Sequence, residues 1–316
     1  MKNIPTIVSI VIILCIPLTT IICMETQHSI YKSQQTALIY APWREDYVNA
    51  QQKPTTLINK TCTFCTIISN PENNKNLILH RGKHSLIMLA SQPYIDNGIH
   101  FLIIPYEHKP ELCNLSSETY AEENMFTQKL CALFSSLANE TYINSNQGIA
   151  AGASIPEHHH KHIMVNHAPR YYNLIDAMEY TKKKINLTVL FKELQPQIEK
   201  LDTVTIPQKK LLVLSNHNCY HCSTMHGDMK KNLIIHRGKH ATAMLSHHPT
   251  YFGEIDIIPH EHIESLETMP VETYEEINQL TTAIYPLVLK IINAQDSNIG
   301  LISYGSKATH KEHIKQ

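Results

Sequence analysis

The sequence predicts an α+β protein built from two copies of one domain, each with short β-strands and one long helix. Three observations lead to this prediction. A nine-residue segment that begins at Asn76 returns at Asn232 with eight residues identical. A C-x-x-C pair precedes this segment in each copy, and one long amphipathic segment follows it. Because chance does not produce matches in this order, we interpret the second half of the chain as a duplicate of the first.

The duplication predicts how the chain is divided. With 316 residues the chain is long enough for two ordinary domains. The first copy is expected at residues 60–170 and the second at residues 211–316, joined by a mostly helical connector at residues 171–210. Residues 26–59 are polar and form an N-terminal extension.

The N-terminus has the composition of a targeting segment. Residues 4–24 form an almost uninterrupted apolar run after a single lysine, the order found in secretory signals and N-terminal anchors. A run of ~20 apolar residues matches a bilayer span better than a buried core helix, which is the alternative. We therefore expect residues 1–25 to be a signal peptide or a membrane anchor, and the protein to be exported. No A-x-A site ends the run, so cleavage and permanent anchoring both stay open.

The charge composition argues against nucleic acid as a partner. Lys and Arg number 27 and Asp and Glu number 28, so no net positive field holds a polyanion along a groove. The 21 histidines are the unusual feature, because histidine serves as metal ligand, proton carrier and phosphoryl acceptor near neutral pH. Their positions therefore indicate the function.

Each copy shows the same order of expected elements: a cysteine knuckle, short β-rich runs, one long helix and a last strand. The helices are expected to begin at Ser116 and Val271, where capping or acidic residues precede apolar residues at three- and four-residue spacing. They are expected to end near Asn139 and Asn293. In the first copy the expected β-runs are residues 77–79, 85–89 and 100–105.

Three histidines, His158, His160 and His162, occur at i, i+2 and i+4 after the first long helix. A β-strand alternates faces with period two, so these imidazoles are expected to project from one side. Gly148 and Gly152 come just before them, and small residues let backbone N–H groups approach an anion closely. A metal-binding polyhistidine stretch is the alternative interpretation.

Four segments of the first copy resemble the histidine-triad (HIT) family of nucleotide hydrolases and transferases. They are residues 41–47, 62–65, 105–112 and 152–162, and the resemblance is closest to the branch of diadenosine tetraphosphate phosphorylases and galactose-1-phosphate uridylyltransferases. The resemblance implies two tandem HIT-like domains, each an antiparallel sheet with one long helix, of which the second is degenerate. It implies a nucleotide or another phosphoanhydride as the small-molecule substrate.

The resemblance also implies roles for single residues. His160 would be the nucleophile that forms a covalent nucleotidyl-histidine, because neutral imidazole both attacks and leaves readily. His162 would form a hydrogen bond near the phosphate or leaving group, and His158 completes the catalytic set. The residues implied to hold phosphate oxygens are Asn146, Gly148 and Ser154. For Asn146 and Ser154, ordinary turn chemistry is the alternative.

Cys62 and Cys65 have zinc-knuckle spacing, and the resemblance to zinc-bearing members adds His108 and His158 as ligands. Four N and S ligands form a closed tetrahedral site, which is structural rather than catalytic. A disulfide or a redox C-x-x-C pair is the alternative, which export favours.

The second copy keeps the four ligand types and loses the nucleophile. Its expected ligands are Cys219, Cys222, His262 and His310. Glu312 stands where the first copy has His160. We therefore expect one structural zinc in each copy and chemistry in the first copy alone.

Several residues depart from the family pattern. Ala90 stands where the family usually has an asparagine that meets the ribose. His159 and Lys161 replace apolar residues, so the other face of the strand is expected to be wetter or to bind something. Trp43, Tyr94 and Phe101 are expected to be packed in the interior, with a base pocket as the alternative.

Two other functions stay open at this stage. One is a non-catalytic, exported zinc-binding scaffold in which both copies are structural. The other is a metal-scavenging protein that uses exposed histidines.

Overall fold

The computed structural model describes residues 62–95, 98–138, 140–149, 151–165, 186–206, 219–225, 227–229, 231–247, 249, 253–294 and 296–304. All of these residues belong to one compact unit, residues 37–249 and 253–316. The second unit, residues 1–36 and 250–252, lies outside the described residues, as do the expected N-terminal extension and His310. Within the described ranges, no helix combines the length and apolar character that crossing a membrane requires.

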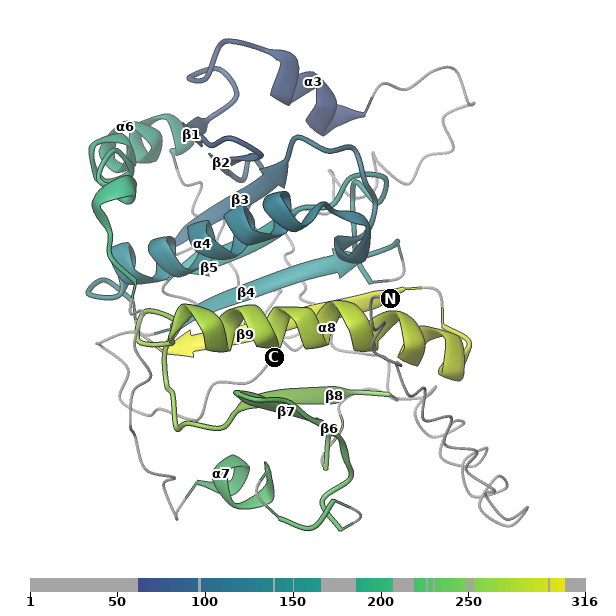
Figure 1. Cartoon of the computed structure of the whole chain (residues 1–316). Helices are drawn as coiled ribbons and strands as arrows, with labels where there is room; N and C mark the ends of the chain where they lie inside the picture. The colour runs from purple at the N-terminus through teal and green to yellow at the C-terminus, as the bar shows by residue number, and fades with distance from the viewer. Residues whose placement is uncertain are drawn as a thin grey trace, which may run out of the picture. The chain divides into compact units, whose positions relative to one another are not determined.

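The first copy forms most of a six-stranded antiparallel sheet in the order β1-β2-β3-β5-β4-β9 (Figure 1). Its elements are α3 (Thr63–Ser69), β1 (Ile78–Arg81), β2 (Ser85–Leu89), β3 (Ile99–Pro105), the 3-10 helix η2 (Leu112–Asn114), α4 (Ser117–Phe134), β4 (Glu140–Gln147) and β5 (Lys161–Val165). The α+β class predicted from the sequence is therefore confirmed, and the β-runs lie within one residue of their predicted starts.

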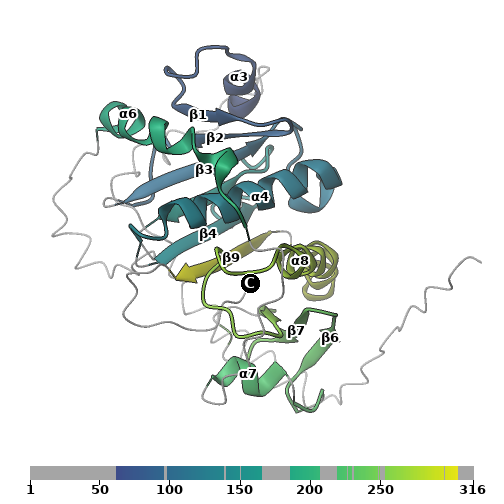
Figure 2. The same cartoon turned by 60° about the vertical axis from the view of Figure 1, so that its left-hand side comes forward.

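The second copy repeats the helix, three strands, long helix and strand of this order, and its described residues contain no counterpart of η2 or β5. Its elements are α7 (Tyr220–Met225), β6 (Ile234–Arg237), β7 (Ala241–Leu245), β8 (Ile255–Pro259), α8 (Val271–Ile292) and β9 (Ser297–Tyr304). Strands β6, β7 and β8 form a separate antiparallel sheet, whereas β9 pairs with β4 of the first copy. The connector contributes α6 (Leu187–Ile198) and the 3-10 helix η3 (Leu201–Thr203), and α6 lies beside β1 (Figure 2).

The long helices begin where the sequence predicts and end differently. The Ser116 side chain caps α4 by accepting the Thr119 amide at 3.3 Å. Helix α4 ends at Phe134, five residues before the predicted Asn139. The Ser135 hydroxyl donates to the Ala132 carbonyl at 3.2 Å, and such side-chain bonds compete with helix continuation. Helix α8 ends as predicted, with Asn293 in the left-handed conformation that closes many helices.

The nearly identical nine-residue segments form the same local structure in both copies. Leu77 and Leu233 both have positive φ, 58° and 55°, and a β-bulge follows each of them. Arg81 then donates to two carbonyls at the end of the first knuckle, at 3.1 and 2.7 Å. Arg237 donates to two carbonyls after the second knuckle in the same way. The repeated motif therefore fastens each cysteine knuckle to its sheet.

A glutamate on each long helix holds the β-hairpin turn that precedes the helix in the sequence. Glu122 of α4 accepts the amides of Lys83 and His84, both at 2.8 Å. Glu276 of α8 accepts the two equivalent amides of the second copy at 2.5 and 2.6 Å. Helix and hairpin are thus joined by charge-assisted bonds that are about twice as strong as neutral ones.

The two copies share one hydrophobic core. Helices α4 and α8 contact each other, and the core that they share contains Phe101, Phe126 and Leu130 together with Ile257, Tyr274 and Leu301. The Tyr120 hydroxyl also donates to the Asn278 carbonyl at 3.0 Å, which joins the helices directly. The opposite face of the sheet packs against α3 through a second cluster that includes Phe64, Leu86, Met88 and Leu102.

Candidate active site and metal site

The three histidines lie on one side of their segment, as the alternation predicts. The rings of His160 and His162 are 4.8 Å apart, and the Phe64 ring lies 5.6 Å from His158 and 4.9 Å from His160. The ladder of β5 begins only at Lys161, so the first two histidines precede the strand. The reason is that the amide of His159 donates to the Lys109 carbonyl, at 2.6 Å, in the loop after β3.

His160 is held in one tautomer. Its Nδ1 lies 2.9 Å from the His158 carbonyl oxygen, which can only accept, so Nδ1 carries the proton. The Nε2 atom then has the lone pair. Burial lowers the pKa of His160 to about 4, with 3% of the residue exposed. The ring is therefore neutral near pH 7, which is the form that acts as a nucleophile.

A chain of hydrogen bonds sets the tautomer of His162. The amide of Tyr94 donates to His100 Nδ1 at 3.0 Å, so a neutral His100 carries its proton on Nε2. This Nε2 lies 2.9 Å from His162 Nδ1 and donates to it. His162 therefore carries its own proton on Nε2. Tyr94 is half-buried and stacks on His100 at 5.4 Å, whereas Phe101 is packed in the core as expected.

The residues predicted to hold phosphate lie on β4 and on the loop that follows it. Asn144 pairs with His162 in the β4–β5 ladder, and continuing that register places Asn146 opposite His160. Gly148 and Gly152 have φ of +95° and +92°, which side chains other than glycine rarely adopt. Ser154 is half-buried at the end of this loop. The structure thus places Asn146 on the histidine face and Gly148 and Ser154 on the loop that follows.

The opposite face of the histidine segment is dry, which corrects the expectation of a wetter surface. His159 and Lys161 are buried, with 2% and 5% of each residue exposed. Both side chains lie near the Glu123 carboxylate of α4, with His159 Nε2 at 3.3 Å and Lys161 Nζ at 3.9 Å. The Lys161 ammonium also donates to Asn124 Oδ1 at 3.1 Å. A charged partner on the helix therefore replaces the apolar packing usual in the family.

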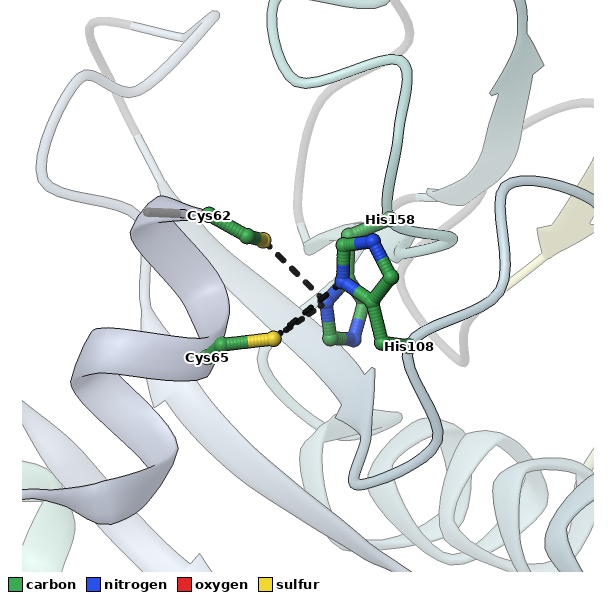
Figure 3. Close-up of side chains that lie close together, drawn as sticks. All are labelled: Cys62, Cys65, His108 and His158. Carbon is green, nitrogen blue, oxygen red and sulfur yellow. Dashed lines mark hydrogen bonds between the residues drawn. The ribbon is translucent and has the colours of Figure 1, made fainter. Parts of the chain in front are cut away.

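Four side chains form a candidate metal site at the start of α3 (Figure 3). The ligand atoms of Cys62, Cys65, His108 and His158 all lie within 4.8 Å of one another. Nδ1 of His158 is 3.4 Å from Cys62 Sγ, and Nδ1 of His108 is 3.2 Å from Cys65 Sγ. Both cysteines are free thiols. Two imidazoles and two thiols around one point are a donor set that suits a tetrahedral metal.

The second nitrogen of His158 supports this arrangement. Its Nε2 lies 2.9 Å from the Pro105 carbonyl and donates to it, so the Nδ1 lone pair faces the two sulfur atoms. Burial also lowers the pKa of His158, which favours the neutral form that a metal requires. His158 therefore belongs to the metal group, although its backbone carbonyl also orients His160.

The first copy is similar in sequence to known proteins. Residues 49–176 match the family described as "Protein similar to CwfJ C-terminal". The AP-4-A phosphorylase of Mycobacterium tuberculosis is 28% identical over 135 residues, which are 41% of this chain and 68% of that protein. The chain therefore resembles the histidine-triad superfamily in sequence and fold. Its similarity is to the phosphorylase and uridylyltransferase branch.

Solved structures show that the likeness in fold extends beyond the first histidine-triad copy. An ADP-glucose phosphorylase from Arabidopsis thaliana with bound ADP-glucose superposes with a TM-score of 0.51 and 17% identity, over 73% of this chain and 70% of that chain. A uridylyltransferase superposes with a TM-score of 0.56 and 14% identity, over 88% of this chain and 81% of that chain. The second copy is therefore part of the shared architecture.

The second histidine-triad copy brings together three of its four predicted metal ligands. The ligand atoms of Cys219, Cys222 and His262 lie within 4.8 Å of one another, with Cys222 Sγ 3.4 Å from His262 Nδ1. The predicted fourth ligand, His310, lies outside the described residues, as does Glu312.

Sequence reasoning missed three residues at the active site: His100, Asn144 and Glu123. A signal for His100 existed, because a histidine interrupts the apolar run 99–105 five residues before Pro105. The residue five before Pro259 is Glu254, so the second copy lacks this histidine too. For Glu123, the only sequence signal was the pair His159 and Lys161, two polar residues at positions where the family has apolar ones.

Proposed function

We propose that the chain is an exported histidine-triad enzyme that transfers or hydrolyses a nucleotidyl group through a covalent intermediate on His160. The observation that carries the proposal is the hydrogen bond from His160 Nδ1 to the His158 carbonyl. It leaves the Nε2 lone pair as the nucleophile on the face where Asn146 and His162 lie. The same bond stabilises the positive charge that the ring acquires when Nε2 binds phosphorus.

The reaction proceeds in two displacements at phosphorus. His160 Nε2 attacks a phosphoanhydride phosphorus, an N–P bond forms, and the P–O bond to the leaving phosphate breaks. His162 acts as the general acid, and its Nε2 donates a proton to the oxygen of the leaving group. Water or a phosphate oxygen then attacks the same phosphorus and breaks the N–P bond, which returns neutral His160. One difficult displacement is thereby divided into two easier ones.

The proposed substrate is a small nucleotide phosphoanhydride. The relatives are a phosphorylase of AP-4-A and a phosphorylase with bound ADP-glucose, and both compounds contain a nucleoside phosphate. Ala90, where the family usually has asparagine, is buried in the cluster under α3 and offers no side-chain hydrogen bond to a ribose. Recognition of the sugar would then come from other residues, and Tyr94, whose ring lies 5.1 Å from that of His162, is a candidate with a hydroxyl group.

We propose a structural zinc ion in each copy. In the first copy Cys62, Cys65, His108 and His158 would hold it, and the ion would fasten α3 to the histidine segment without taking part in the displacement. In the second copy Cys219, Cys222 and His262 would hold it together with His310. A bound metal supplies folding free energy to such a site.

The decisive experiment is intact-protein mass spectrometry after brief exposure to diadenosine tetraphosphate or ADP-glucose. Wild-type protein is expected to gain the mass of one nucleotidyl group, and His160→Ala is expected to gain none. A matched control is His236→Ala, which changes an exposed histidine of the second copy and should leave the adduct intact. Equal turnover by the wild type and His160→Ala would refute this mechanism.

The same spectrum tests export. The mass of protein recovered from the secreted or membrane fraction shows whether residues 1–25 have been removed or retained. Recovery of the full-length chain in the soluble cytosolic fraction alone would contradict export.

A non-catalytic zinc-binding scaffold is the second candidate, and the buried Ala90 favours it. A scaffold binds metal without forming the adduct. A nucleotidyl group trapped on His160 would therefore exclude it.

A further inference from the structure

We propose that the second copy completes the phosphate site of the first, through a hydrogen bond by which Asn298 orients the side chain of Asn146. The inference rests on the proposed function, because it assigns Asn298 as a positioning residue for the anion that the loop after β4 would bind. It also explains what a copy with Glu312 in place of a nucleophile contributes to the enzyme.

Three strands place the relevant side chains in one row. Strand β9 pairs with β4 along its whole length, and Asn298 lies directly opposite Asn146. Directly opposite residues of an antiparallel pair have side chains on the same face of the sheet. Because Asn144 lies opposite His162 in the next ladder, Asn146 and Asn298 share the face of the catalytic histidines. The row therefore crosses from the second copy to the nucleophile.

Two donors fix the orientation of the Asn146 amide. Its Oδ1 accepts from Asn144 Nδ2 and from Asn298 Nδ2, both at 2.7 Å. A carbonyl oxygen has two lone pairs, so these donors occupy both. A flipped amide would direct its NH2 group at two other NH2 groups. The Nδ2 of Asn146 must therefore point the other way.

The Nδ2 of Asn146 therefore points toward the loop after β4. Asn146 Nδ2 lies 3.9 Å from the position that a Cβ on Gly152 would occupy, beside the turn that starts at Gly148. An anion on this turn thus meets an N–H donor of Asn146 and not its carbonyl oxygen. The second copy borders the turn again at Asp296, whose carboxylate occupies the position that a Cβ on Gly148 would take.

The test uses inorganic pyrophosphate as the probe, because its binding needs no turnover. Asn298 is exposed, so Asn298→Ala should unfold at the wild-type temperature. Its dissociation constant for pyrophosphate, measured by calorimetry, is expected to rise about fivefold, the effect of losing one hydrogen bond. Asn298→Asp is expected to bind more weakly still, because a carboxylate accepts from Asn146 and turns its Oδ1 toward the anion.

A double-mutant cycle separates orientation from simple charge repulsion. If Asn298 acts through Asn146, then adding Asn298→Ala or Asn298→Asp to Asn146→Ala should cause little further loss. Additive losses would overturn the inference, because they would show that residue 298 acts on the anion independently. Equal binding by the wild type and Asn298→Ala would also overturn it.

The outcome is distinguishable from failure of the proposed function. A wild-type protein that binds pyrophosphate but never forms the His160 adduct refutes the enzyme while the cycle still decides the role of Asn298. A wild-type protein that forms the adduct but fails the cycle refutes the inference alone. A wild-type protein that binds no pyrophosphate refutes the inference as well.

Discussion

Glu123 of α4 and Lys161 of β5 form a buried ion pair, with Lys161 Nζ 3.9 Å from the carboxylate, behind the strand segment that carries His160. Burial lowers the pKa of Lys161, and the Glu123 carboxylate opposes this shift. Ser145 and Gln147 extend the network, because both side chains lie within hydrogen-bonding distance of His159 Nδ1. The Ser145 hydroxyl also donates to the His160 carbonyl at 3.3 Å. Helix α4 thus holds the side chains of the two residues that flank the proposed nucleophile, and β4 holds its carbonyl oxygen.

Glu123→Leu should destabilise the protein by about 3–5 kcal/mol, because it leaves the Lys161 charge buried without its partner. The double variant Glu123→Leu/Lys161→Met restores the apolar packing usual in the family and should recover much of that loss. Urea denaturation of the two variants measures the difference. Equal stabilities for the single and double variants would show that the pair is not coupled.

Glu122 should make stability depend on acid pH. Burial raises the pKa of Glu122, but hydrogen bonds from the Ser85 hydroxyl and from the backbone amides of His84, Lys83 and Ser85 outweigh it and hold the pKa below its usual value. A group whose pKa is lower in the folded state stabilises the fold above its unfolded pKa, and this contribution is lost as pH falls through the folded pKa. Glu122→Gln should therefore be less stable than the wild type at pH 7 and approach it below about pH 4. A constant difference across this range would contradict the assignment.

Metal stoichiometry tests the two proposed zinc sites separately. The wild type should hold two zinc ions, Cys65→Ser should hold one, and Cys222→Ser should hold one, as measured by elemental analysis of dialysed protein. Cys113→Ser is the matched control, because Cys113 lies in η2 and its backbone amide, which donates to the Tyr285 hydroxyl, is kept. A chelator should lower the melting temperature of the wild type more than that of Cys65→Ser. Unchanged stoichiometry in Cys65→Ser would contradict the first site.

The parts of the fold that the sequence predicted depend on local patterns. The period-two spacing of His158, His160 and His162 was enough to place their rings on one side, and the C-x-x-C spacing was enough to aim both thiols in one direction. The repeated segment at Asn76 and Asn232 predicted the same bulged strand in each copy. These features are set by residues within a few positions of each other.

The features that the sequence did not reveal depend on pairing between distant segments. His159 and Lys161 suggested a wet strand face because their partner, Glu123, lies on a helix that precedes them by a whole strand. The role of Asn298 depends on the pairing of β9 with β4 of the first copy. Hydrophobic periodicity places a strand in a sheet but does not specify its neighbour, so such contacts follow from tertiary structure alone.

His100 provides the last prediction, because its Nε2 donates to His162 and so keeps the His162 proton on the side facing the substrate. His162→Ala removes the proposed acid and should slow adduct formation by about 10²–10⁴-fold. His100→Leu keeps His162 but removes the donor that fixes its tautomer, so it should slow the reaction by less. Zinc content should not change, which separates this effect from damage to the metal site. Mass spectrometry measures the rate of nucleotidyl transfer to His160 in the wild type, in His162→Ala and in His100→Leu. His236→Leu serves as the control. If His100→Leu reacts as fast as the wild type, the tautomer of His162 is set by the substrate and not by the protein.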